Sequence, residues 1–284
     1  MEEITQGMPA ASVLPSNPAV PLTIEGASLL HQMLRLRWRD WKALPAEARR
    51  EIAREAAAWL EGLEPPGERQ SALYLVLGHK SDVMLVHFRR SFDELHQAEL
   101  ELAGLRLFDF LEPVGSFLSV VELSLYESTV RLYASLAERG IAPGSEAWLR
   151  EVEATLERQK RAMAPRLWPE IPPRRFLCFY PMDRRRGESK NWYEVSLEER
   201  RRMMHEHGEA GRKYADQVKQ IISGSIGFDD WEWGVDLFAD DPLVFKKLIY
   251  EMRFDEASAV YAVFGPFYVG RRVTASELAP LLAP

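Results

Sequence analysis

The sequence predicts an α+β fold built from two similar halves within one chain. Three observations predict it. Strand-like runs come in pairs around tight turns, helix-forming segments open with capping boxes, and the element order of residues 25–126 returns in residues 171–284. That order, β-α-β-β-α-β, is the split β-α-β or ferredoxin-like arrangement. We therefore expect two antiparallel sheets that pack face to face as an α+β barrel, with the helices outside.

The first half follows a loose N-terminal arm, residues 1–24. Four segments have strand patterns: 27–38, 71–78, 82–89 and 114–126. The short turn HKS between the second and third of them predicts a hairpin. Two segments are rich in helix formers: 45–63 and 91–105. Ser91, with Glu94 three residues later, forms a capping box at the start of the second helix.

A mostly helical connector, residues 127–170, leads to the second half, residues 171–284. This half has four strand candidates: 176–182, 219–228, 231–239 and 258–270. It has two helix candidates: 196–218 and 242–254. Ser196 and Glu199 form a capping box at the start of the first of these helices.

Composition excludes several classes of protein. The net charge of −7 argues against general nucleic-acid binding, which relies on many Lys and Arg side chains facing phosphates. The single cysteine, Cys178, lies in an apolar run, so we interpret it as a small buried hydrophobe in a reducing compartment. The sequence begins without a signal-peptide pattern, and no segment reaches the roughly 18 apolar residues of a membrane span. We expect a cytoplasmic protein with no nucleic-acid or membrane partner.

Two histidines lie two residues apart in HEHGEAGRKY, residues 205–214. On a helix each residue turns by about 100°, so His205 and His207 point about 200° apart and cannot hold one ion. The buried face carries His207, together with Met203, Ala210, Gly211, Tyr214 and Val218. Two interpretations of His207 stay open: a core histidine satisfied by hydrogen bonds, or an axial ligand of haem iron beside small residues. A zinc site is less attractive, because the other histidines show no short ligand spacing.

A basic and aromatic stretch, residues 174–195, has five arginines and one aspartate within residues 174–186. It is either a solvated loop or a clamp for carboxylates, which guanidinium groups bind in bidentate fashion. Tyr180 precedes Pro181 at a strand end, where its phenol is either structural or a redox centre. The motifs GxGxxG, GxxxxGK[ST] and GxSxG do not occur, so most familiar enzyme classes lack support.

Three stretches resemble signature blocks of the coproheme decarboxylases of Gram-positive bacteria, relatives of chlorite dismutase: CFYPMDRRRGESKNWY (178–193), HEHGEAGRKYADQVKQIISGSIGFDDWEWGV (205–235) and FKKLIYEMRFDEASAVYAVFGPFYVG (245–270). The similarity is densest over about 166–270. The resemblance implies two ferredoxin-like halves in each subunit, a homopentamer, and a haem site in the C-terminal half. It also implies a transient contact with a coproporphyrin ferrochelatase.

The resemblance further implies a reaction. Hydrogen peroxide would drive oxidative decarboxylation of two propionates of Fe-coproporphyrin III, which is both substrate and cofactor, and haem b would be the product. His207 matches the proximal iron ligand, Tyr180 the radical-forming tyrosine, and Arg184 a catalytic position. The positions that match the rest of the porphyrin pocket are Arg166, Met182, Trp192, Arg212, Gln220, Trp233 and Ser258.

Two positions depart from the family pattern. Arg184 stands where relatives usually have Lys, and a guanidinium gives up a proton far less readily. Trp168 stands where relatives tend to have Tyr, so one propionate hydrogen bond is altered. Two alternatives remain. Chlorite dismutation uses a distal arginine where this chain has the neutral Gln220, and a haem carrier or sensor would need His207 and the arginines but not Tyr180.

Overall fold

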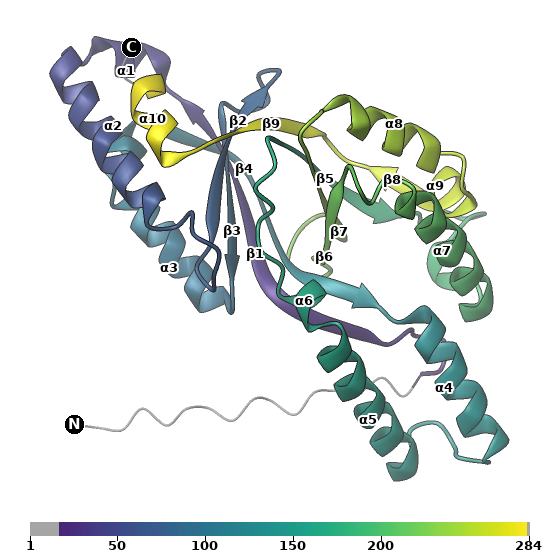
Figure 1. Cartoon of the computed structure of the whole chain (residues 1–284). Helices are drawn as coiled ribbons and strands as arrows, with labels where there is room; N and C mark the ends of the chain where they lie inside the picture. The colour runs from purple at the N-terminus through teal and green to yellow at the C-terminus, as the bar shows by residue number, and fades with distance from the viewer. Residues whose placement is uncertain (1–16, 283–284) are drawn as a thin grey trace, which may run out of the picture.

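The computed structural model describes residues 17–282, and within this range nine strands form one antiparallel sheet (Figure 1). Hydrogen-bonded neighbours follow the order β7-β6-β4-β1-β3-β2-β9-β5, and β5 pairs in turn with β7, so the sheet closes into a barrel. β8 pairs with the last residues of β5. The strands are β1 (Thr23–Leu36), β2 (Ser71–Leu77), β3 (Val83–Arg89), β4 (Leu111–Ser124), β5 (Phe176–Arg184), β6 (Lys219–Gly224), β7 (Trp233–Ala239), β8 (Ala262–Phe264) and β9 (Tyr268–Val273).

Helices cover the outside of this barrel. Those of the first half and the connector are α1 (Trp38–Ala43), α2 (Ala46–Glu61), α3 (Phe92–Ala103), α4 (Tyr126–Glu138), α5 (Glu146–Ala162) and α6 (Ala164–Leu167). Those of the second half are α7 (Leu197–Arg212), α8 (Leu243–Met252), α9 (Glu256–Tyr261) and α10 (Ala275–Leu282). Short 3-10 turns lie at Arg106–Phe110 and Trp192–Glu194. Figure 1 shows α2 and α10 at one side of the molecule and α7 and α8 at the other. Within residues 17–282, no helix is long and apolar enough to cross a membrane.

The two halves have the same strand order. The first half runs β4-β1-β3-β2 and the second β9-β5-β7-β6, and the pairs β2–β9 and β4–β6 join them. The predicted α+β class and single-chain barrel are therefore confirmed. The two expected sheets are hydrogen-bonded at both seams, so they form one closed sheet. The serine caps of the predicted capping boxes are present: the side chains of Ser91 and Ser196 accept from the amides of Glu94 and Glu199 at 3.3 and 3.2 Å.

The prediction of a single strand over 258–270 was wrong. Residues 256–261 form α9, because the Asp255 side chain accepts from the amide of Ser258 at 2.9 Å and caps a helix. The strand pattern resumes only in β8 and β9, which Gly265, Pro266 and Phe267 separate. The helix predicted over 196–218 ends earlier, at Arg212, and turns lead from there into β6.

Apolar side chains fill the barrel and both of its outer layers. Inside, residues of both halves meet, including Leu29, Phe117 and Phe179, and His31 contacts Asp236 at 2.8 Å with both side chains fully buried. The outer face of the first half packs on α2 and α10 through a leucine-rich cluster. The outer face of the second half packs on α8 through a separate cluster that includes Tyr180. This second outer layer holds most of the predicted site.

Candidate functional site

Four of the predicted site residues lie on the outer face of the second half. Successive strand residues point to opposite faces. Leu177 and Phe179 therefore point into the barrel, whereas Cys178 and Tyr180 point outward. The pairing of β5 with β7 places Met182 opposite Trp233. On β6, Gln220 lies on the same face as Ile222, and Ile222 pairs with Val235 of β7. The strands thus bring together Tyr180, Met182, Trp233 and Gln220.

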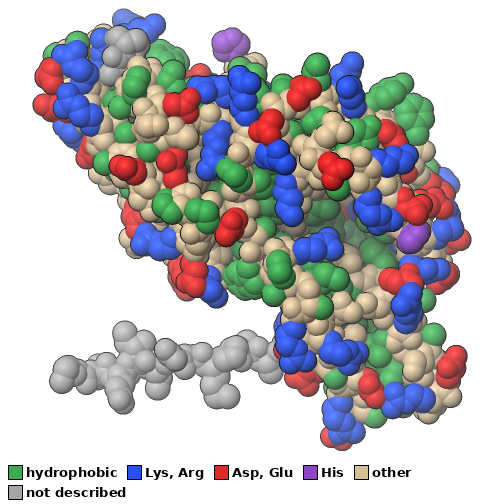
Figure 2. Space-filling model, in the orientation of Figure 1, with side chains coloured by type: hydrophobic (Ala, Val, Ile, Leu, Met, Phe, Trp, Pro, Cys, Tyr) green, Lys and Arg blue, Asp and Glu red, His purple; other side chains and the backbone are tan. Residues whose placement is uncertain are grey.

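Helix α7 supplies the histidine. His207 has 20% of its side chain exposed, whereas His205 is 62% exposed. Figure 2 shows acidic and basic side chains intermixed on the side of the molecule where Figure 1 places α7. The predicted assignment of the two faces is therefore confirmed. Gly211 lies close to the sheet, since a Cβ built on it would be 3.9 Å from Oε1 of Gln220. This distance is an ordinary van der Waals contact, so α7 and β6 lie side by side at this point.

Asp255 holds the imidazole of His207. Nδ1 of His207 lies 3.0 Å from Oδ2 of Asp255 and 3.3 Å from Oγ of Ser258. Burial disfavours ionisation of Asp255, but hydrogen bonds from His207 and Ser258 hold the pKa of this carboxyl below its ordinary value. With the Nδ1 proton directed at Asp255, Nε2 carries the lone pair that a metal ion requires.

Arg184 is a part-buried cation whose guanidinium hydrogen-bonds to neutral atoms. Its guanidinium donates to the carbonyl of Ala257 at 3.2 Å and to Sδ of Met204 at 3.4 Å, and it lies 4.6 Å from the ring of Trp192. Among residues 17–282, no carboxylate oxygen lies within 4.0 Å of it. Burial lowers the pKa of Arg184. A part-buried guanidinium with no carboxylate at ion-pair distance is a place for an anion.

Two further side chains on this face are suited to a polar ligand. Tyr180 is 6% exposed and packs on Phe267 and Phe264, with ring centroids 4.6 and 5.8 Å away. Burial raises the pKa of its phenol, so the side chain keeps its proton. Nε1 of Trp233 is buried and has no hydrogen-bond partner among the described residues. Burial also raises the pKa of the Cys178 thiol to about 12, so this thiol is not a nucleophile at neutral pH.

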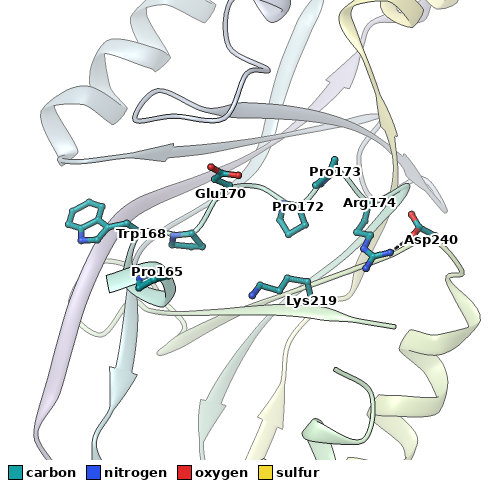
Figure 3. Close-up of a pocket in the computed structure, with 9 residues that line it drawn as sticks. Pro165, Trp168, Glu170, Pro172, Pro173, Arg174, Lys219 and Asp240 are labelled. Carbon is teal, nitrogen blue, oxygen red and sulfur yellow. Dashed lines mark hydrogen bonds and ion pairs between the residues drawn. The ribbon is translucent and has the colours of Figure 1, made fainter. Parts of the chain in front are cut away.

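Two predicted residues lie outside this group. Arg212 is 65% exposed on α7, with its nearest carboxylate, that of Glu209, 3.9 Å away. Arg166 is exposed on α6, which packs on β1 and β4. An open hollow of about 640 Å³ lies next to α6, beside the proline-rich segment 168–173 (Figure 3). Trp168 and Lys219 line it, and Arg174 pairs with Asp240 at 2.5 Å on its wall. None of the predicted site residues lines this hollow.

Sequence reasoning missed two buried acidic residues at the site. Asp255 contacts His207 across 48 residues of sequence, and Glu232 accepts from the amide of Arg184 and from the hydroxyl of Tyr193. The pattern of Asp255 followed by Ser258 could have indicated a helix cap. Glu232 gave no comparable signal, because its partners are set by the pairing of β5 with β7.

Comparison with known proteins gives consistent matches over nearly the whole chain. The profile of the family described as chlorite dismutase matches residues 49–273. A coproheme decarboxylase from Staphylococcus saprophyticus is 40% identical over 269 residues, which cover 94% of this chain and 99% of that protein. Relatives from Natronomonas pharaonis and Haloquadratum walsbyi are 41% and 39% identical over 93% of this chain. The chain spans less than half of these two proteins, 42% and 47% of their lengths.

Solved structures match as well. A haem-binding protein from Thermus thermophilus has a TM-score of 0.79 and 38% identity, with 94% of this chain and 99% of that chain covered. A chlorite dismutase variant from Candidatus Nitrospira defluvii has a TM-score of 0.67 at 20% identity, over 92% of this chain and 96% of that chain. The second match is a likeness of fold.

Proposed function

The chain belongs to the chlorite dismutase family, and from this premise we propose that it is a coproheme decarboxylase. In this proposal, hydrogen peroxide drives oxidative decarboxylation of two of the four propionates of Fe-coproporphyrin III, and the product is haem b. The observation that carries the proposal is Arg184, a part-buried guanidinium that forms no ion pair within 4.0 Å with a carboxylate of residues 17–282. The substrate is a tetracarboxylate, and the S. saprophyticus relative is named for this reaction.

The residues present fit an iron porphyrin. His207 would bind the iron through Nε2, because Asp255 engages Nδ1 and fixes the ring. The carboxylate on Nδ1 raises the basicity of the imidazole. Gln220, Met182 and Trp233 would line the pocket from the strands, while Ser258 would line it from α9 and Trp192 from the 3-10 turn Trp192–Glu194. When bound, the iron would be the group that reacts with hydrogen peroxide.

The protein's own side chains have separate tasks in this scheme. Arg184 binds a propionate, and the unpaired Nε1–H of Trp233 is a further donor. Tyr180 keeps its proton and provides the phenol that exchanges a hydrogen atom with the propionate side chain. Each decarboxylation converts one propionate, one peroxide and one proton into a vinyl group, carbon dioxide and two waters. Arg184 is a poor source of this proton, since a guanidinium releases one only with difficulty.

Mass analysis of the pigment tests the proposal. The purified protein is loaded with coproheme, treated with hydrogen peroxide, and its pigment extracted. We expect stepwise loss of two carboxyl groups, each as carbon dioxide with two hydrogens. Pigment that keeps all four propionates would favour a haem carrier, and oxygen release from added chlorite would favour chlorite dismutation. The homopentamer and the ferrochelatase contact stay predictions from the family resemblance.

A further inference from the structure

Glu232 lies just before β7 and beside the candidate site. Its side chain is buried, with the whole residue 7% exposed. Oε2 accepts a hydrogen bond from the amide of Arg184 at 2.9 Å and another from the hydroxyl of Tyr193 at 2.8 Å. Oε1 lies 3.5 Å from Nε of Arg186. One carboxylate therefore contacts both ends of the basic loop, which we define as residues 184–195.

The same loop contacts Tyr261 at two points, and one hydrogen bond within the loop joins Trp192 to Arg185. The amide of Arg185 donates to the carbonyl of Tyr261 at 2.7 Å, and the amide of Trp192 donates to the carbonyl of Arg185 at 2.9 Å. The ring of Trp192 lies against that of Tyr261, with centroids 5.3 Å apart. Trp192 in turn lies beneath the guanidinium of Arg184. The path of the loop thus decides where this guanidinium stands.

The Arg184 side chain forms only neutral contacts with the rest of the protein. Its partners are a carbonyl, a thioether and an aromatic ring, and none of these forms an ion pair. Its backbone amide, by contrast, donates to a buried carboxylate, which is a charge-assisted hydrogen bond and stronger than a neutral one. Glu232 therefore adds a side-chain anchor to a residue that the pairing of β5 with β8 also holds, opposite Ala262.

We propose that Glu232 is a positioning residue, which fixes the basic loop so that Arg184 and Trp192 stand ready for a propionate of the porphyrin. The consequence for catalysis rests on the proposed function. The anchoring itself does not, because it concerns contacts within the chain. Removing the carboxylate leaves the Arg184 amide and the Tyr193 hydroxyl with a weaker acceptor, and the loop becomes free to move.

The experiment compares three variants with the parent protein. Glu232→Gln removes the charge but keeps the size of the side chain, and Tyr193→Phe removes one of the two hydrogen bonds. Glu188→Gln is the matched control, because it makes the same change at an exposed residue of the same loop. Hydrogen exchange of peptides within 184–195 reports on the loop. Absorbance titration gives the dissociation constant for coproheme, and peroxide turnover of the saturated protein gives kcat.

We expect faster exchange in 184–195 for Glu232→Gln and, to a lesser extent, for Tyr193→Phe. The coproheme dissociation constant should rise on the order of 10-fold and about 3-fold in these two variants, while Glu188→Gln matches the parent. A larger change in affinity than in kcat is the sign of positioning. If Glu232→Gln does not fold, Tyr193→Phe decides by the same two readouts.

Two results would overturn the inference. Unchanged exchange in 184–195 would show that Glu232 does not hold the loop. Faster exchange with parental coproheme affinity would show that the held loop does not matter for binding. If the parent itself binds coproheme but does not convert it, the proposed function fails. The exchange and affinity measurements would still judge the role of Glu232.

Discussion

Replacement of Arg184 by methionine separates a ligand-binding role from a structural one. The variant keeps a long side chain but loses a buried cation, whose burial is unfavourable without a carboxylate partner. It also loses one hydrogen bond to a carbonyl and the contact with the Trp192 ring, each worth about 1 kcal/mol. Because these effects oppose each other, we expect the free energy of unfolding of the apoprotein to change by no more than about 1 kcal/mol.

Coproheme binding should respond much more strongly. A charge-assisted hydrogen bond to a propionate is worth about 1.5–3 kcal/mol, so its loss should raise the dissociation constant roughly 10- to 100-fold. Urea unfolding of the apoprotein and absorbance titration with coproheme measure the two quantities. Arg185→Met is the control, since Arg185 is an exposed neighbour with the same charge. A loss of several kcal/mol in stability with parental affinity for coproheme would refute the carboxylate-binding role of Arg184.

Two further predictions concern the same site, and a third concerns Glu122 on β4. His207→Ala should abolish the absorbance features of histidine-ligated iron while His205→Ala keeps them, since only His207 contacts Asp255; equal spectra in the two variants would disprove proximal ligation. Tyr180→Phe should bind coproheme like the parent but release little or no haem b, because Phe has no O–H to lose; haem b formation at the parental rate would make the tyrosine structural. Burial raises the pKa of Glu122 to about 7, so the folded state keeps this proton to a higher pH than the unfolded state does. The free energy of unfolding should therefore fall by an amount on the order of 1–3 kcal/mol as pH rises from about 4.5 to 7. The free energy of unfolding, plotted against pH over this range, should have a smaller slope for Glu122→Gln than for the parent. An unchanged slope would contradict the raised pKa of Glu122.

Local patterns in the sequence predicted most of the fold. Alternation and capping boxes located the strands and helices of both halves, because these signals depend on neighbouring residues. The segment 258–270 failed for the same reason: its apolar run resembles a strand, but the Asp255 cap starts α9 inside it. Closure of the sheet through β2–β9 and β4–β6 could not be read from periodicity, since it pairs strands from different halves.

The candidate site was predictable in part. Strand periodicity places Tyr180 and Met182 on one face, and helical geometry separates His207 from His205. The residues that hold this set in place, Asp255 and Glu232, were missed because their contacts span distant parts of the chain. A role at the porphyrin for Arg166 and Arg212, both exposed in the structure, stays a prediction of the family resemblance.

Counting peroxide against product tests the central claim most directly. The coproheme-loaded protein is titrated with hydrogen peroxide in limiting steps, and the pigment is separated by mass after each step. If the protein is a coproheme decarboxylase, each propionate should consume one peroxide. A species with three propionates should then appear first, and haem b should be complete at two equivalents. Bleached pigment that still carries four propionates after two equivalents, with no haem b at any step, would contradict the proposed function.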